Sequence, residues 1–579
     1  MRQLFVYLKP YIKYVILAPI GMFLEVLCEL MMPKLMTGII NYGVAAKDFQ
    51  YIGKTGALMI FLAILGILGG IGCLIAASKA SQGFGTDVRY AMFQKIQEFS
   101  FGDIDKFKTS SLITRLTNDI TQVQMVVLMS LRLLIRAPLL FIGGIVMAFT
   151  INAELAKLFI VLVPIVVIVM AVILKFSFPL FNQVQQKLDK VNTVMRENFS
   201  GVRVVKAFVR SDYEQKKFRA VNEDYKMTTI KAFRIMVLMM PAMMIIMNLA
   251  VTAILWFGGV QVSQGTILIG DIMAFIHYLT QIPMAHLMIA MVFMLISRAK
   301  VSADRIAEVI HCEVTLKDPQ NPVKNAITKG KVEYKNVTFR YKGGSGQPVL
   351  ENVNFTAEPG QTVAILGTTG SGKSTLVNLM PRLYDVTDGE VLIDGVNVKD
   401  MPLEELRSKV SVVLQEAVLF SGTIKDNIRW GKEDATDEEI IAAAKAAQAH
   451  DFIMNMPKGY DTELGQQGVN ISGGQKQRLS IARALIKQPA ILIFDDSTSA
   501  VDMVTEKKIQ KALKENMQGI TKFIIAQRIS SVMEADEILV LSNGTISAAG
   551  THEQLLQTSS EYQDIYQSQT GKGAVFHEQ

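Results

Sequence analysis

Six apolar stretches dominate the first half of the chain, and each is long enough to cross a lipid bilayer, which takes about 20 helical residues. They lie near residues 14–36, 55–79, 127–150, 155–176, 234–258 and 271–297. Inside a bilayer every backbone polar group needs a partner within the protein, and a helix supplies these partners within one segment. We therefore expect an all-α membrane domain with six spanning helices over residues 1–300.

The polar connections between these stretches differ in length and in charge. The connections after the first, third and fifth stretches are short and carry two lysines in total, Lys47 and Lys54. Those after the second and fourth, about residues 80–126 and 177–233, carry five and eleven Lys or Arg residues. Because positive loops stay on the cytoplasmic side, we expect the long connections, the N-terminus and the chain after the sixth stretch to be cytoplasmic.

The two long connections keep a helical periodicity, so we interpret them as spanning helices that continue into the cytoplasm. A short crossing helix is expected at each tip, within residues 99–116 and 201–218. The net charge of +7 comes from residues that flank apolar runs, and no basic patch with interleaved aromatic residues occurs. The sequence therefore favours a lipid bilayer, and not a nucleic acid, as the partner of these charges.

Glu25 and Glu29 lie four residues apart, on one face of the first expected span. A charge at this depth is costly, so both side chains should face a cavity or a partner. One hypothesis is that they attract cationic substrates. The alternatives are a position at a wet cavity mouth, or an ion pair with Lys34 or with another helix.

Methionine is abundant in the fifth and sixth expected spans. Flexible thioethers suit a binding surface that adapts to several ligands, although they also suit ordinary packing and contact with lipid. The candidate substrate contacts are Glu25, Glu29, Met240, Met244, Met288 and Met291.

Residues 367–375, GTTGSGKST, follow the apolar strand TVAIL and open a helical run. This is the P-loop pattern in the strand–loop–helix context that it requires. Glycines let backbone amides approach phosphates, which the helix N-terminus also attracts. We expect Lys373 to reach the β- and γ-phosphates of ATP and the Ser374 hydroxyl to bind Mg²⁺. The nucleotide contacts predicted here are Gly367, Thr368, Thr369, Gly370, Ser371, Gly372, Lys373, Ser374 and Thr375.

Two further motifs follow the P-loop. ILIFD, residues 491–495, reads as a buried strand that ends in Asp495, which is expected to complete the Mg²⁺ shell. NISGGQKQR, residues 470–478, places a serine and two glycines ahead of a helix, which makes a second N-terminus that can face a phosphate.

With these motifs in place, the chain resembles an ABC exporter half-transporter, in which six spanning helices precede one α/β P-loop ATP-binding cassette. The resemblance covers nearly the whole chain. It implies a membrane domain over residues 1–300, a linker over 301–330, a cassette over 331–570 and a loose tail over 571–579. It also implies a multi-pass protein of a bacterial cytoplasmic membrane, with ATP and Mg²⁺ as its cofactors.

The resemblance assigns further roles by motif. Tyr341 in VTFRY would stack on adenine, and Gln415 in VVLQE would join the Mg²⁺ and contact the membrane domain. Residues 462–468 would touch the intracellular tips, and residues 499–502 would form the D-loop. The signature ISGGQ carries Ile471 where the family usually has leucine. Its phosphate contacts would be Ser472, Gly473, Gly474 and Gln475.

Two positions depart from the family pattern. The catalytic glutamate after the second acidic strand is replaced by Asp496, and the switch histidine is replaced by Gln527. An aspartate is one methylene shorter, and a misplacement of about 1 Å can cost roughly 10²-fold in rate. Gln527 can donate a hydrogen bond but cannot become a cation. We therefore expect a site that holds ATP without efficient turnover.

An intact signature beside impaired hydrolytic residues is the pattern expected of one subunit of a heterodimer. The predicted partner is a second, related chain that carries the glutamate and the histidine. The chain thus resembles the degenerate-site subunit of bacterial heterodimeric multidrug exporters, with a hydrophobic or amphiphilic small molecule as substrate. The alternatives are a lipid or peptide exporter, a homodimer with slow ATPase activity, and an ATP-binding membrane sensor that does not transport.

Overall fold

The computed structural model describes residues 2–341, 346–497, 501–517 and 519–570, and the side chains of part of the last membrane helix lie outside this description. The chain forms two compact units. One consists of Met1–Lys95 with Ser110–Cys312, and the other of Ile96–Thr109 with Glu313–Gln579. The predicted tail, residues 571–579, lies outside the described residues.

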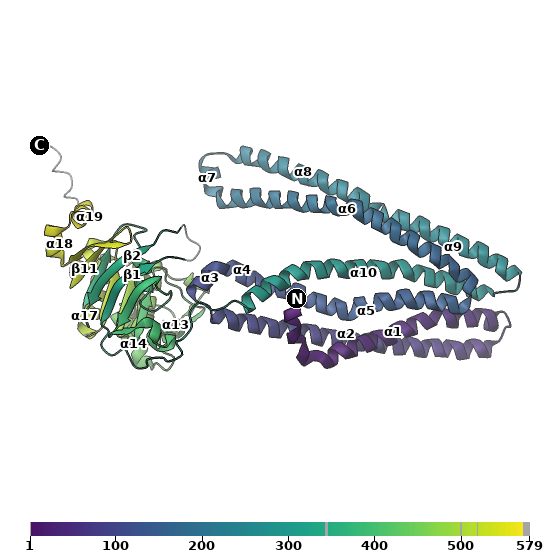
Figure 1. Cartoon of the computed structure of the whole chain (residues 1–579), viewed down its shortest axis with the longest axis horizontal. Coiled ribbons are helices and arrows are strands. Elements are labelled where there is room, and N and C mark those ends of the chain that lie inside the picture. Colours follow the sequence, from purple (N-terminus) through teal and green to yellow (C-terminus); the bar gives the residue numbers. More distant parts are fainter. Residues whose placement is uncertain (1, 342–345, 498–500, 518, 571–579) are drawn as a thin grey trace. The chain divides into compact units, whose positions relative to one another are not determined.

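The first unit is helical (Figure 1). Its elements are η1 (Arg2–Tyr11), α1 (Ile12–Gly38), η2 (Ile39–Val44), α2 (Phe49–Gln97), α4 (Thr109–Thr114), η3 (Arg115–Asp119), α5 (Ile120–Ile151), α6 (Ala153–Ser200), α7 (Val202–Ala207), α8 (Ser211–Val237), α9 (Met239–Ser263) and α10 (Ile269–Ile310). Within the described residues, five helical stretches are long and apolar enough to span a bilayer, and α10, with 42 residues, occupies the sixth predicted position. The 49 residues of α2 extend over about 74 Å, far beyond a hydrocarbon core of about 30 Å.

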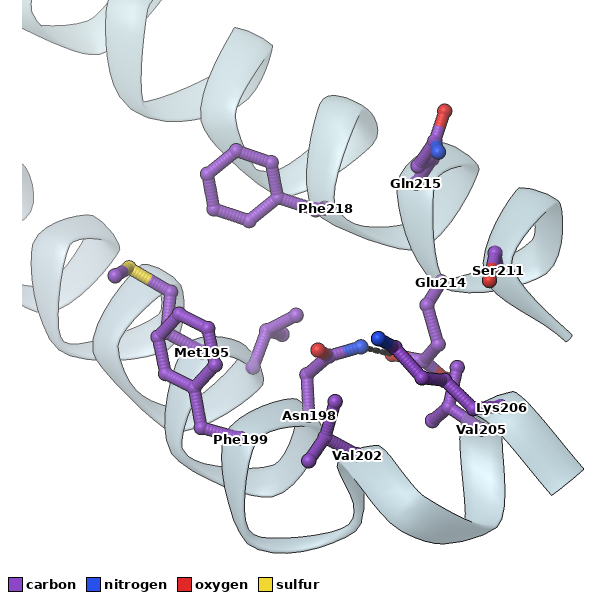
Figure 2. A pocket seen from close by; sticks show the side chains of 11 residues that line it. Met195, Asn198, Phe199, Val202, Val205, Lys206, Ser211, Glu214, Gln215 and Phe218 are labelled. Atoms are coloured by element: carbon purple, nitrogen blue, oxygen red, sulfur yellow. Dashed lines mark hydrogen bonds between the residues drawn. The ribbon is translucent and has the colours of Figure 1, made fainter.

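Both predicted tip helices are present, as α3 (Phe101–Phe107) and α7. Figure 2 shows the turn around α7, where Phe199 and Phe218 come from α6 and α8. A cavity of about 400 Å³ lies between these helices, and a hydrogen bond from Asn198 to Glu214 (3.3 Å) crosses it. The backbone of α7 thus turns the chain without closing the gap between α6 and α8.

Helices α1 and α2 approach each other closely at two glycines. A Cβ atom on Gly69 would lie 2.9 Å from the carbonyl oxygen of Gly21, and a Cβ on Gly21 would lie 2.7 Å from that of Gly69. Side chains larger than hydrogen would push the two backbones apart, as at small-residue helix contacts in membranes. At the next residue of α2, a Cβ on Gly70 would lie 2.8 Å from Oε2 of Glu25, which is one turn after Gly21 on α1.

The second unit is an α/β cassette built on two main sheets. The six-stranded sheet has the order β12-β11-β3-β10-β9-β6, with β12 antiparallel to β11 and the other pairings parallel. Its strands are β3 (Thr362–Leu366), β6 (Val410–Val413), β9 (Ile491–Asp495), β10 (Thr521–Ile525), β11 (Glu537–Ser542) and β12 (Thr545–Gly550). The antiparallel sheet β2-β1-β4-β5 contains β1 (Val332–Phe339), β2 (Leu350–Ala357), β4 (Asp388–Ile393) and β5 (Val396–Asn397), and β7 (Gly422–Thr423) pairs with β8 (Glu463–Leu464).

Helices cover these sheets, and several of them pack with residues of β6, β8 and β9 in a second apolar cluster. They are α11 (Lys373–Asn378), α12 (Leu403–Lys409), α13 (Ile424–Arg429), α14 (Asp437–Ala446), α15 (His450–Met454), α16 (Gly473–Leu485), α17 (Met503–Asn516), α18 (His552–Thr558) and α19 (Ser560–Thr570). Strands β3 and β9 are apolar and buried along nearly their whole length. Their parallel course brings their carboxyl ends to one edge of the sheet, where ligands of such sheets bind.

The structure corrects the predicted linker. Helix α10 runs to Ile310, so the first ten residues of the predicted linker 301–330 belong to the membrane unit. The reason is packing, because Ala303, Ile306 and Val309 follow a helical spacing and are fully buried. The short helix α3, predicted as part of the membrane half, groups with the cassette instead.

The Gly21–Gly69 contact predicts a difference between two similar substitutions. Gly69→Ala should destabilise the protein by about 1–3 kcal/mol, the usual cost of overpacking, because its Cβ meets the backbone of α1. Gly72→Ala on the same helix should be neutral, since nothing lies within 4 Å of its Cβ position. Thermal unfolding of both variants in lipid nanodiscs measures this, and equal melting temperatures would contradict the close contact.

Candidate functional site

The P-loop connects β3 to α11 and depends on two glycines. Gly367 and Gly372 have φ of +152° and +100°, in the range that favours glycine. A Cβ on Gly367 would lie 2.2 Å from the carbonyl oxygen of Leu541, and one on Gly372 would lie 2.9 Å from that of Val349. The glycines therefore let the loop turn tightly against neighbouring backbone.

Lys373 begins α11 and folds back over the loop. Its Nζ donates to the carbonyl oxygens of Gly367 (2.8 Å) and Thr368 (2.7 Å). Burial lowers the pKa of this amine, and the nearby carboxylates of Asp496 and Asp495 act in the opposite direction. An anion bound in the loop would stabilise the charged form of Lys373, which burial disfavours.

Asp495 lies at the end of β9 and is buried. Its Oδ1 accepts a hydrogen bond from Ser374 Oγ at 2.8 Å. Burial raises the pKa of Asp495, and the hydrogen bond from Ser374 lowers it. The negative charge of Asp496 raises the pKa of Asp495 further, while the positive charge of Lys373 lowers it. A buried carboxylate beside a hydroxyl offers the oxygen donors that Mg²⁺ prefers, so Ser374 and Asp495 fit this ion. Mg²⁺ commonly needs few protein ligands because nucleotide phosphates and water supply the others.

Asp496 is buried and held by two amides. Its Oδ2 accepts hydrogen bonds from Gln415 Nε2 at 3.1 Å and from Gln527 Nε2 at 2.7 Å. Its backbone has a φ of +47°, which is uncommon for a residue other than glycine. The three residues assigned to hydrolysis by sequence motif are thus in direct contact.

These groups line one cavity of about 300 Å³. The lining residues are Val349, Thr369, Gly370, Gly372, Lys373, Ser374, Thr375, Gln415, Asp495, Asp496, Ile525 and Gln527. The structure therefore brings the P-loop, the two acids and both glutamines together. Ser371 is buried in the loop, and its hydroxyl has no hydrogen-bond partner within the described part of the chain.

Tyr341 lies next to the P-loop, with its hydroxyl 3.0 Å from Thr375 Oγ1. Its ring packs edge-to-face on Phe339 and Tyr384, at centroid distances of 4.8 and 5.3 Å. Tyr341 remains 38% exposed, so part of its surface is accessible to a planar ligand.

Sequence reasoning did not find Tyr384. Its hydroxyl donates to Asp105 of α3 at 2.9 Å, and its ring lies near Phe101 of the same helix. Burial and the hydrogen bond to Asp105 raise the pKa of Tyr384. Helix α3 is thereby connected to the aromatic group that contains Tyr341. No local motif marks this pairing, because the two residues are 279 positions apart.

The signature residues lie elsewhere on the cassette. Ser472 caps α16, where its Oγ accepts from Gln475 N and its own N–H donates to Gln475 Oε1 (2.9 Å). Among the described residues that line the P-loop cavity, none belongs to the signature group Ser472, Gly473, Gly474 and Gln475. Residues 499 and 500 of the predicted D-loop, 499–502, lie outside the described residues, while Asp502 caps α17 by accepting from Thr505 N.

In the membrane unit, Glu25 and Glu29 share one partner. The guanidinium of Arg136 on α5 pairs with Glu25 Oε1 and, at 2.8 Å, with Glu29 Oε2. Of the alternatives that the sequence left open, pairing with another helix is the one found. The signal for Arg136 was present, as an arginine inside the third apolar stretch. Both carboxylates line a cavity of about 490 Å³ between α1 and α2, which Arg132 of α5 also lines.

The candidate methionines do not gather at this cavity. Met240, Met244 and Met291 are exposed on their helices, and Met288 packs against the helical core. Within the described residues, the methionine that lines the cavity of Glu25 and Glu29 is Met32.

Comparisons with known proteins agree with this architecture. Residues 15–286 match the family described as the ABC transporter transmembrane region, and residues 350–499 match the family described as ABC transporter. The ABC transporter ATP-binding protein YfiB of Bacillus subtilis is 44% identical over 572 residues, 99% of each chain. YgaD of Bacillus subtilis, which is named for multidrug export, is 36% identical, and the match covers 83% of each chain.

A solved structure of a bacterial Atm1-family ABC exporter with ATP bound matches with a TM-score of 0.77 at 26% identity. The match covers 98% of this chain and 99% of that chain. The predicted fold class, a helical membrane domain followed by an α/β ATP-binding cassette, is therefore confirmed.

The exposed ring of Tyr341 predicts that it contributes to base binding. Tyr341→Ala should weaken ATP binding about tenfold or more, because stacking of a base on an aromatic ring contributes about 1–3 kcal/mol. Tyr341→Phe, which keeps the ring and loses only the hydroxyl, should bind nearly as the wild type. Titration with a fluorescent ATP analogue measures both, and binding of inorganic triphosphate should not change. Equal ATP affinity in all three proteins would exclude stacking on Tyr341.

Proposed function

The chain belongs to the ABC transporter family and has the architecture of an exporter, and we propose that it is one subunit of a heterodimeric exporter of drug-like amphiphiles. Its own ATP site retains nucleotide with little turnover, and its signature completes the active site of a related partner. The observation that carries this proposal is the contact of Asp496 with two amides, at the position where an efficient site needs a free general base.

The residues that would bind ATP are in place. Lys373 and the P-loop amides would hold the phosphates, and Ser374 with Asp495 would hold Mg²⁺. A bound ion would supply positive charge that offsets the charge of the phosphates. Gln415 contacts Asp496 and lines the same cavity, so it can sense the nucleotide. The described residues therefore include the expected contacts for the phosphates and for Mg²⁺.

Hydrolysis is a different matter, because a general base must lie within hydrogen-bond reach of its water. Asp496 is one methylene shorter than glutamate, and its Oδ2 is already occupied by Gln415 and Gln527. Gln527 donates a neutral amide where a histidine could become a cation at the γ-phosphate. Both departures weaken the same step, the activation of water.

The signature supports a two-chain active site. Ser472 opens a helix of 13 residues whose N-terminus can receive a phosphate, yet it does not line the P-loop cavity of its own chain. A second cassette would have to supply the P-loop that faces it. We propose a partner that carries the glutamate and the histidine, so that the dimer has one fast site and one retaining site.

Transport would use alternating access, with ATP closing the cassettes and the intracellular helices passing the motion to the membrane unit. The substrate class rests on the apolar membrane unit and on the relative named for multidrug export. Because Glu25 and Glu29 both pair with Arg136 of another helix, we assign these carboxylates to helix pairing before cation attraction. The charge distribution of the loops supports a cytoplasmic N-terminus and cassette in a bacterial cytoplasmic membrane.

The impaired site predicts a specific gain of function. The purified chain alone should bind Mg-ATP but turn it over near background. The double variant Asp496→Glu with Gln527→His should raise turnover by about 10²-fold, since it restores reach and charge. ATPase assays in lipid measure this, with Lys373→Ala in the double variant as the control that abolishes the gain.

Other outcomes of these assays identify the alternatives. Turnover of the wild-type chain at about 1 s⁻¹ or more, within the ordinary enzyme range, would establish a working homodimer. ATP binding without substrate-stimulated turnover, even with the partner present, would indicate a sensor. Vesicles assayed with lipid and drug substrates separate the two export classes.

The ion pairs of Arg136 with Glu25 and Glu29 predict an effect on stability. Glu25→Gln with Glu29→Gln removes both carboxylates that pair with Arg136 and should therefore destabilise the membrane unit. The expected loss is about 1–3 kcal/mol, less than for a fully buried pair, because these groups are only partly shielded from solvent. Adding Arg136→Gln should restore much of the loss. Thermal unfolding measures stability, and efflux of cationic and neutral dyes should fall in parallel. Selective loss of cationic dye transport at unchanged stability would instead support cation attraction.

A further inference from the structure

The switch segment, residues 526–531, follows β10 and is attached on two sides. On the inner side, Gln527 Nε2 donates to Asp496 Oδ2 at 2.7 Å. On the outer side, the side chain of Gln569 binds the main chain twice. Its Nε2 donates to the carbonyl oxygen of Gln527 at 2.7 Å, and its Oε1 accepts from the N–H of Ile529 at 2.8 Å. One amide thereby fixes both the residue that enters the ATP cavity and a residue just beyond it.

Gln569 is presented by a helix that is itself well anchored. It lies in the last turn of α19, whose Tyr562 is fully buried and hydrogen-bonded to His552 Nδ1. Tyr562 belongs to the same apolar cluster as Ile529. The helix and the switch segment therefore pack on a common core. The Gln569 amide adds directional bonds that this apolar contact lacks.

We propose that Gln569 is a positioning residue, which fixes the switch segment so that the Gln527 side chain stays at the γ-phosphate side of the ATP cavity. Gln527 lines that cavity together with Lys373, the residue expected to reach the β- and γ-phosphates. Without the two hydrogen bonds from Gln569, the switch segment keeps its apolar contact through Ile529. Its main chain at Gln527 is then no longer held in one orientation. The inference rests on the proposed binding of ATP by this cassette and does not depend on the identity of the partner.

The proposal makes a distinction between nucleotides. ATP carries the γ-phosphate that Gln527 faces, whereas ADP lacks it. A loosened switch segment should therefore shorten the residence of ATP and leave that of ADP nearly unchanged. A general loss of structure around α19 would weaken the binding of ATP and of ADP alike, since both nucleotides need the P-loop.

The test uses the full-length chain in lipid nanodiscs and fluorescent analogues of Mg-ATP and Mg-ADP. Gln569→Ala should accelerate ATP dissociation about three- to tenfold, as expected for the loss of hydrogen bonds of ordinary strength, with ADP dissociation within about twofold of wild type. Gln569→Glu keeps the acceptor for Ile529 and loses the donor to Gln527, so an intermediate rate is expected. The matched control is Gln567→Ala, an exposed glutamine on the same helix that makes no side-chain hydrogen bond within the described residues.

The proposal would be overturned if the ratio of the ATP dissociation rate to the ADP dissociation rate were the same in Gln569→Ala as in wild type. It would also be overturned by an equal effect of Gln567→Ala, or by a parallel loss of ATP and ADP with a lowered melting temperature. If Gln569→Ala does not fold, the ratio measured for Gln569→Glu decides the same question. Failure of the wild-type chain to bind ATP would overturn the proposed function as well, so the two failures are distinguishable.

Discussion

The parallel pairing of β3, β10, β9 and β6 is the constraint on which the nucleotide site depends. In this register Asp495 lies opposite Ile525, and Phe494 lies opposite Val413. The residues that follow these strand ends, Asp496, Gln527 and Gln415, therefore emerge at one edge and come into hydrogen-bond contact. The backbone N–H of Asp496 donates to the carbonyl oxygen of Ile525, which secures the ladder at that point. A slip of one residue would turn every side chain to the opposite face of the sheet.

The site could be predicted from the sequence to the extent that its chemistry is local. The P-loop is a continuous stretch between a strand and a helix, so its glycine, lysine and serine spacing in that context identifies it. The acids at the end of β9 and the two glutamines follow apolar strands in the same way. The membrane helices were predictable because the bilayer imposes a minimum apolar length.

Other contacts could not be predicted, because their partners are distant in sequence and each residue alone has an ordinary environment. Arg136 is 111 residues from Glu25, and Tyr384 is 279 residues from Asp105. Gln569 is one of three glutamines on α19, and no local pattern distinguishes it from Gln567 in the same turn. The end of α10 was misplaced for a related reason, since the apolar spacing of Ala303, Ile306 and Val309 is interrupted by charged residues.

The membership of α3 in the cassette unit bears on how such a protein can be divided. The chain passes between its two units three times, near residues 95, 109 and 312. A single cut at the end of α10 would release a cassette whose Tyr384 has lost Asp105 and Phe101 as neighbours. The cassette is therefore not a module that recombination can exchange at one boundary. A cassette exchanged between two transporters would meet a foreign α3, and the seven residues of this helix would have to be exchanged with it.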